Sequence, residues 1–294
     1  MTTLTTVLNK LKQLFSGSTT VISISADGKY NIKLRQSNQL LNTIGIPHIN
    51  QVKQLTIAGK INTTDLAVIK KMKQMEHLDI QHTQIVSSHK TIHSGNKRIG
   101  KHLFQGNLTI KSILLPDMMT EISDFAFAGC LNLSMVSLPK SLIKIGAQSF
   151  MQTGITKISI PSSVTHIEEN AFYQCKNLRT IHFEDGKQSM KWTGLGFTGC
   201  PISELYIGRD ISEDDYCEFE NPSTLQRVTI GPNVSRLNIY LGENLKELTF
   251  LCPTPPAGNI VLPKHCTIKI PASYYKNYWI HPIWGEKDIQ PIEQ

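Results

Sequence analysis

The residues most able to do chemistry are five histidines that lie close together in the first half of the chain. Imidazoles four positions apart share one face of a helix, so His89 and His93 could both bind a zinc ion. Such a site needs a third ligand at a fixed spacing, and the sequence supplies none there. We therefore expect a loop with scattered histidines, and no metal, for the set of His77, His82, His89, His93 and His102.

Sequence patterns that mark catalytic centres are missing. The chain has no Gly-x-Ser-x-Gly turn for a serine nucleophile and no glycine-rich loop of the kind that holds phosphate groups. No regular spacing places a cysteine beside a histidine, the pair that makes a nucleophile and its base. The sequence predicts a protein that is not an enzyme, with no catalytic residue and no cofactor.

Charge is distributed unevenly, although the whole chain has a net charge of +7 at pH 7. Residues 1–111 contain 15 Lys and Arg and 4 Asp and Glu, a net charge of +11, whereas the remainder has a net charge of −4. Such a basic half attracts anionic partners, although most charged faces are simply solvated. No nucleic-acid-binding motif and no aromatic-rich basic strand accompanies it, so we expect no specific nucleic acid.

A repeat of 22 or 23 residues must position all of these side chains. Each unit has a short aliphatic strand that ends in proline, followed by isoleucine, then phenylalanine, then cysteine or threonine. The strand starts at Ile113, Val136 and Ile158, which are 23 and 22 residues apart. A period in the twenties with one strand per unit is typical of a leucine-rich-repeat solenoid.

The repeat extends in both directions from these units. Nine pairs of inward-pointing residues fit it, from Leu55 with Ile57 to Leu248 with Phe250. The spacing between the strands at Leu78 and Ile113 is 35 residues, which indicates an insert near residues 86–97. We predict an α/β solenoid, a right-handed leucine-rich-repeat array with one continuous parallel sheet on the inner face and short helical or irregular turns opposite.

Each position in the repeat has a physical role. Alternation along a strand points the first and third residues into the core and the middle one to solvent. Phenylalanines at one position are expected to stack as a spine, formed by Phe104, Phe127, Phe150, Phe172, Phe197 and Phe219. Three positions later come small residues able to hydrogen-bond a turn, among them Cys130, Cys175 and Cys200.

Cysteine usage favours buried free thiols, because three of the six cysteines share one repeat position where a thiol acts as a small hydrophobic group. Disulfides stay open as an alternative. The pairs to test would be Cys175 with Cys200, on adjacent coils, and Cys252 with Cys266.

These repeats resemble the BspA-like leucine-rich-repeat family of bacterial surface proteins, of the Bacteroidetes type. The resemblance is specific over residues 99–183. The segment from Leu55 to Asp65 is similar to the entry segment of such proteins, and a Tyr- and Trp-rich segment with Tyr278 is similar to their closing unit. In the coils after Phe183 the unit departs from the pattern, with Trp192 and Asp214 at the isoleucine position.

The resemblance divides the chain into three parts. Residues 1–50 are expected to form an N-terminal helix and capping segment, residues 51–250 the repeat array, and residues 251–294 a C-terminal cap. The first twenty residues space their apolar side chains like an amphipathic helix and unlike the apolar block of a secretion signal. We expect this segment to pack on the first coil or to form a loosely ordered terminus, with attachment to a membrane surface as the alternative.

The resemblance implies a location at the cell surface or outside the cell. Because no secretion signal is apparent, a cytoplasmic location also stays open. No stretch has the length and apolar character of a transmembrane segment.

The outward middle positions of the strands form one stripe of mostly small, polar residues. A tyrosine with a nearby arginine is the type of anchor that carries much of the contact energy in interfaces. The candidate partner-binding residues are His182, Tyr206, Arg227, Leu114 and Asp79. The alternative is that the C-terminal cap or a loop covers Tyr206.

The resemblance implies a non-enzymatic binding and adhesion module that recognises a protein partner, for example a host matrix or surface protein, through the sheet face. A second hypothesis is polyanion or carbohydrate binding through the basic N-terminal half. A third is a structural spacer that holds another domain away from the cell envelope.

Overall fold

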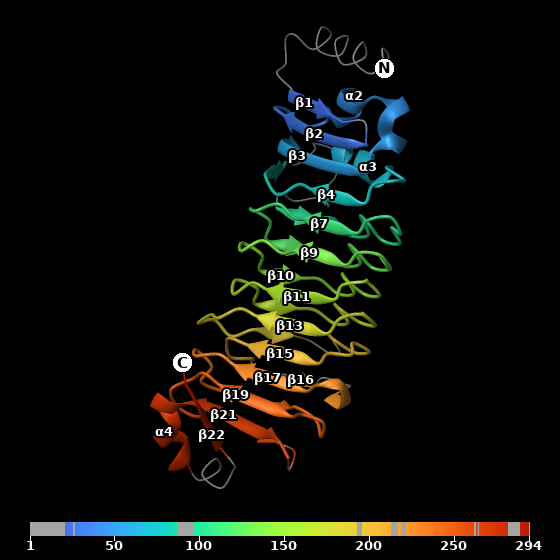
Figure 1. The fold of residues 1–294 in the computed structure, drawn as a ribbon. Helices are drawn as coiled ribbons and strands as arrows, with labels where there is room; N and C mark the ends of the chain where they lie inside the picture. Colours follow the sequence, from blue (N-terminus) through green and yellow to red (C-terminus); the bar gives the residue numbers. More distant parts are fainter. Residues whose placement is uncertain are drawn as a thin grey trace.

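The protein is an elongated stack of coils, with one strand above another along its length (Figure 1). This arrangement confirms the predicted repeat solenoid. The computed structural model describes residues 21–293 except residues 26, 87–96, 193–195, 213–216, 219–221, 262, 264 and 282–288.

The main ladder takes one strand from each coil. All of its neighbouring strands are parallel except the first two, which are antiparallel. Its first part consists of β1 (Val21–Ile24), β2 (Lys29–Leu34), β3 (Gln54–Ile61), β4 (His77–Asp79), β7 (Ser112–Leu114) and β9 (Met135–Ser137). Its second part consists of β11 (Lys157–Ile160), β13 (Thr180–Phe183), β15 (Glu204–Ile207), β17 (Arg227–Ile230), β19 (Glu247–Phe250), β21 (Thr267–Pro271) and β22 (Ile289–Ile292).

The ladder has one break, between β9 and β11, where the two parts form separate hydrogen-bonded sheets. The predicted continuous sheet therefore keeps its order and direction but is interrupted once in its hydrogen bonding. At the break Val136 and Leu138 are half-buried, whereas the inward residues of the other predicted pairs are buried.

A second, narrower ladder contains the isoleucine that follows the proline of each unit. Its strands have two residues each, and the pairing of Ile167 with Trp192 confirms the register predicted for that irregular coil. Asp214, the next residue at this position, lies outside the described residues. The strands are β6 (Arg98–Ile99), β8 (Glu121–Ile122), β10 (Lys144–Ile145), β12 (His166–Ile167) and β14 (Lys191–Trp192), followed in a separate sheet by β16 (Cys217–Glu218), β18 (Ile239–Tyr240) and β20 (Ile260–Val261).

The phenylalanine spine is present as predicted. Neighbouring rings from Phe104 to Phe197 are stacked with centroids 5.1 to 5.5 Å apart and planes 6 to 9° from parallel. Every ring of this series is buried, so each depends on the coils above and below it. Phe219, the last ring assigned to the spine, lies outside the described residues.

The cysteines join successive coils. Cys130 donates a hydrogen bond from Sγ to the carbonyl oxygen of Phe104, at 3.0 Å, and Cys175 and Cys200 make the same bond to the phenylalanine of the preceding unit. The sequence predicted a bond within the turn, which Asn107 does make by accepting from the backbone of Thr109 and Ile110. The five cysteines whose side chains are described are free thiols.

The thiols differ in burial, which predicts an order of chemical modification. Burial raises the pKa of the Cys130 thiol to about 12, and Cys130 is inaccessible to solvent, whereas Cys266 is partly exposed with a pKa of about 11. Because the thiolate is the reactive form, iodoacetamide at pH 8 is expected to modify Cys266 before Cys130. Peptide mass spectrometry after timed labelling measures this order. Modification of Cys130 in the folded protein as fast as in the urea-unfolded protein would contradict it.

Helices replace the second ladder in the first coils (Figure 1). Asp65 of α3 (Thr63–Lys70) is buried and accepts hydrogen bonds from the backbone N–H groups of Asn38, Leu40 and Asn62, so one carboxylate ties three chain segments together. The strand β5 (Thr83–Ile85) pairs with the end of β3. The helices here are α2 (Leu40–Ile44), the 3-10 helix η1 (Ile46–Gln51) and α3 (Thr63–Lys70).

The C-terminal end is closed by the 3-10 helix η3 (Ala272–Tyr274), α4 (Tyr275–Trp279) and β22. Tyr278 is fully buried, packs on Phe250, and its hydroxyl donates to the carbonyl oxygen of Cys252. Trp279 is 55% exposed. A further 3-10 helix, η2, spans Pro222–Thr224. Strands of both end segments join the main ladder, and the boundaries at residues 50 and 250 stay predictions.

Candidate functional site

The strand register brings the outward middle positions into line, as the repeat predicted. Residues at this position pair directly across the ladder, with Ser159 next to His182 and His182 next to Tyr206. Thr229, Thr249 and Lys269 continue the row. The row is therefore a real surface feature, and the role of its members in binding is a separate question.

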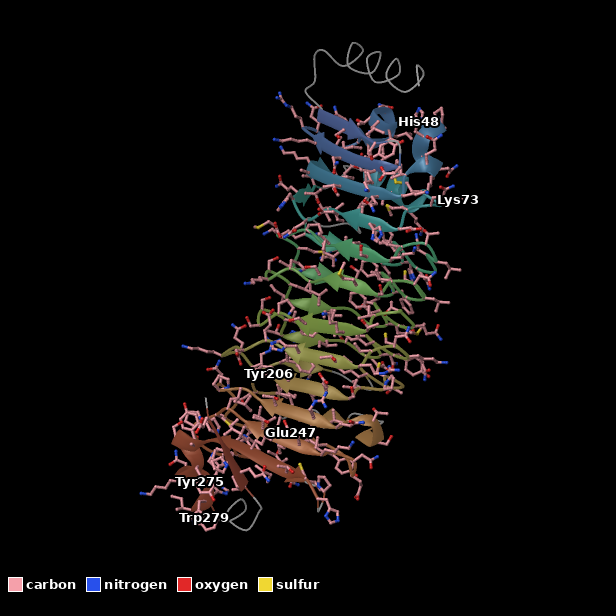
Figure 2. All side chains as sticks on the ribbon, viewed as in Figure 1. His48, Lys73, Tyr206, Glu247, Tyr275 and Trp279 are labelled. Atoms are coloured by element: carbon pink, nitrogen blue, oxygen red, sulfur yellow. The ribbon has the colours of Figure 1, made fainter. Side chains whose placement is uncertain are left out.

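His182 and Tyr206 form one ordered cluster on this face. Their rings are stacked, with centroids 4.3 Å apart and planes 12° from parallel, and the Tyr206 hydroxyl donates to Oδ1 of Asp185 at 2.8 Å. Burial and, to a lesser degree, the Asp185 carboxylate raise the pKa of Tyr206, so its phenol is a neutral donor at physiological pH. Figure 2 shows Tyr206 on the strands of the C-terminal half.

Tyr206 is partly covered by its own neighbours. The ring contacts His182, and the hydroxyl contacts Asp185 in the turn after β13. The labelled residues of α4, Tyr275 and Trp279, lie at the C-terminal end of the stack (Figure 2). His182 is exposed and Tyr206 is partly exposed, so the cluster is open to a partner.

A buried arginine, Arg209, lies next to the turn that carries Asp185. Arg209 has no solvent exposure, and its guanidinium donates to the carbonyl oxygens of Ser162 and, at 2.9 Å, Pro161. Gly186, the residue after Asp185, lies close to the Arg209 side chain, since a Cβ at that position would be 3.3 Å from Cδ of Arg209. Burial lowers the pKa of Arg209 to about 10, so it stays charged at neutral pH.

Arg227 lies in the neighbouring outward row and is already paired. Its guanidinium forms a salt bridge with Glu204, the residue opposite it on β15. On the other side Glu247 bonds Lys269, a member of the middle row, at 2.7 Å, so charges of alternating sign follow one another from Glu204 to Lys269. A shallow depression of about 410 Å³ is lined by Arg227, Glu247 and Lys269 together with residues of the adjoining strands.

Leu114 and Asp79 lie apart from the His182 cluster, on the other side of the break in the ladder. They face each other in the register of β4 and β7, and both are half-buried. Asp79 accepts a hydrogen bond from the backbone of Gln81 and so shapes its own turn. The structure therefore divides the five predicted residues into one cluster, one ion-paired arginine and one distant pair.

Two features of the site were missed at the level of sequence. Asp185 binds the Tyr206 hydroxyl, and Arg209 lies beside the turn of Asp185. Both occupy the second position after the inward pair of their strands, but no single residue type recurs there, since Asp117, Lys140 and Ser162 stand at this position in other units. The sequence signal for Arg209 was a charged residue directly after Gly208, the glycine that follows β15.

The histidines of the first half have separate partners. His77 hydrogen-bonds Ser112 at 2.7 Å, His82 contacts Asp117 at 3.3 Å, and His102 stacks on Phe125. In the part of the chain that the structure describes, no three His, Cys, Asp or Glu side chains form a group suited to a metal ion. His89 and His93 lie outside that part.

No helix among the described residues combines the length and apolar character required to span a bilayer.

The stacked parallel coils and an exposed strand face define a leucine-rich-repeat solenoid. A family model for the BspA type leucine rich repeat region matches residues 97–192 and 144–254, with six copies of the repeat. These matches cover more than half of the chain. The protein therefore belongs to the BspA-type leucine-rich-repeat family.

Solved structures with a similar fold include a leucine-rich repeat protein from Bacteroides ovatus ATCC 8483, 15% identical with a TM-score of 0.38, where the alignment covers 93% of this chain and 98% of that one. A leucine rich cell surface protein from Faecalibacterium prausnitzii A2-165 is 15% identical with a TM-score of 0.30, over 95% and 93% of the two chains. The pneumococcal vaccine antigen PcpA is 14% identical with a TM-score of 0.27, over 84% and 62%. A comparison with curated proteins finds no match.

Proposed function

We propose that the protein is a non-enzymatic binding module that recognises a protein partner through the outward face of its strands. The observation that carries this proposal is the stack of His182 on Tyr206, fixed by the hydrogen bond to Asp185. An aromatic side chain that is already ordered loses little conformational freedom when a partner binds. Tyrosine is also among the residues that most often dominate interface energetics.

The surroundings of the cluster suit a protein partner. The next outward positions are occupied by Ser159 and Thr229, which leave the aromatic pair accessible. Beside them, the ion pairs of Glu204 with Arg227 and of Glu247 with Lys269 provide a polar rim. An aromatic centre with a polar rim is the usual anatomy of an interface.

We place this activity at the cell surface, and a host matrix or surface protein is the proposed partner class. Support comes from membership of a repeat family whose proteins generally mediate protein binding or adhesion. One of the structurally similar proteins is itself described as a cell surface protein.

The test is a double variant, His182→Ala with Tyr206→Ala, assayed by surface plasmon resonance against a panel of immobilised extracellular matrix proteins. We expect at least one member of the panel to bind the unchanged protein. The double variant is expected to weaken that binding by about tenfold or more, as for loss of a dominant aromatic contact.

The matched control is Ser159→Ala with Thr249→Ala, two substitutions in the same outward row, which is expected to change the affinity less than about twofold. If the folded protein binds no member of the panel, the proposed partner class is wrong. If both double variants bind equally well, the cluster is not the recognition surface and a spacer role is favoured.

A further inference from the structure

A second surface lies at the opposite end of the array from the His182 cluster and is independent of the function proposed above. It is a cavity of about 680 Å³ bounded by the ends of β2 and β3, by β5, and by the turn after β7. Its size is within the range of natural ligand sites. The residues that the argument uses are Lys33, Arg35, Lys60, Gln84, Lys97 and Met118.

Four cations surround this cavity, and none has a salt bridge among the residues that the structure describes. Lys33, Arg35, Lys60 and Lys97 are all exposed. The one acidic residue in the lining, Asp117, is engaged by Gln81 at 3.0 Å and by His82 at 3.3 Å. The cavity is thus strongly positive.

Gly59 lines this cavity where β3 passes between β2 and β5. At this residue β3 leaves the register of β4 and pairs with β5 instead. Gly59 has φ of 97°, and a Cβ there would lie 1.8 Å from the carbonyl oxygen of Leu34. Only glycine fits such a position, and Lys60 follows it directly toward the cavity.

The side chains indicate which anion would bind. An ion pair with one exposed lysine contributes little, so useful affinity requires a ligand that presents several anionic groups to several cations at once. None of the described residues that line the cavity is a Phe, Tyr or Trp, on which nucleobases would stack. Gln84 offers an exposed amide to hydroxyl groups, and Met118, 60% exposed, offers an apolar contact to the C–H face of a sugar ring.

We propose that this cavity is a binding site for a sulfated polysaccharide, whose sulfate groups are held by Lys33, Arg35, Lys60 and Lys97. The site would act separately from protein recognition by the strand face, because none of its residues belongs to that face's cluster.

The experiment measures binding of a heparin decasaccharide by isothermal titration calorimetry at two salt concentrations. The test variant is Lys33→Gln/Arg35→Gln/Lys60→Gln. The control is Lys71→Gln/Lys73→Gln/Lys140→Gln, which removes the same charge from exposed positions outside the cavity. We expect the test variant to lose about tenfold or more in affinity and to show a weaker salt dependence, while the control changes less than about threefold.

The same titrations are carried out with a desulfated decasaccharide, a single-stranded DNA oligonucleotide and poly-glutamate of matched length. Binding of the sulfated sugar well above all three supports the proposal. No heparin binding, equal loss in both triple variants, or equal affinity for the desulfated sugar would overturn it. Equal or tighter binding of DNA or poly-glutamate would also overturn it, in favour of a nucleic acid or an acidic protein segment. Circular dichroism of both variants confirms that each is folded.

Discussion

Replacing Phe150 with alanine is expected to lower the free energy of unfolding by about 3 to 5 kcal/mol. Phe150 is fully buried at the middle of the spine, stacked on Phe127 at 5.2 Å and on Phe172 at 5.2 Å. Removing the ring leaves a cavity, and each of the two neighbouring rings loses a stacking partner. Because coils are stabilised mainly by their neighbours, the loss affects the array on both sides. Urea unfolding followed by circular dichroism measures the change.

Phe125→Ala is the matched control for this substitution. Phe125 is the same residue type in a neighbouring coil, but it is half-buried and stacks on the exposed His102. Its removal is expected to cost about 1 kcal/mol, in the range of an ordinary substitution. Equal destabilisation by the two substitutions would contradict the spine as the main source of cohesion between coils.

The spine could be predicted because a stacked solenoid requires the same side chain at the same place in every coil. The residues Phe104 to Phe197 recur at 22 to 25 residues, and this spacing alone placed their rings in one column. The same argument placed Trp192 opposite Ile167, although tryptophan is unlike the residue it replaces. Periodicity is strong evidence because the coils share one core.

Features that occur once could not be predicted in this way. The break between β9 and β11 coincides with the step of 22 between Val136 and Ile158, but a step of one residue less does not say whether hydrogen bonds are lost. Similarly, the sequence selected His182 and Tyr206 as unusual members of the stripe, whereas their stacking depends on ring orientation. The ion pair that engages Arg227 likewise follows from register and rotamer together.

The buried Arg209 is the clearest case of a contact that sequence analysis could not reveal. Its partners, Pro161 and Ser162, stand 48 and 47 residues earlier in the chain, two coils away. No local pattern connects residues at that distance. Since Cδ of Arg209 lies beside Gly186, the side chain also packs next to the turn that carries Asp185, the acceptor of the Tyr206 hydroxyl.

Substituting Arg209 with alanine is therefore expected to lower the free energy of unfolding by about 3 to 5 kcal/mol, the combined cost of two lost hydrogen bonds and of lost packing. Two carbonyl oxygens would lose their donor, at about 1 to 3 kcal/mol each when buried, and the side chain would leave a cavity. Arg179→Ala is the control, because Arg179 is exposed and its guanidinium donates to the carbonyl oxygen of Lys176 at 2.9 Å.

Arg209→Met separates the two contributions, since methionine fills much of the space but donates no hydrogen bond. We expect it to recover part of the stability lost in the alanine variant and to remain less stable than the unchanged protein. If the hydrogen bonds also hold Asp185 in place, both Arg209 variants should weaken partner binding at the His182 and Tyr206 cluster below the unfolding temperature, while Arg179→Ala should not. Arg209 variants that unfold like the unchanged protein would show that this buried cation contributes nothing to the joining of the three coils.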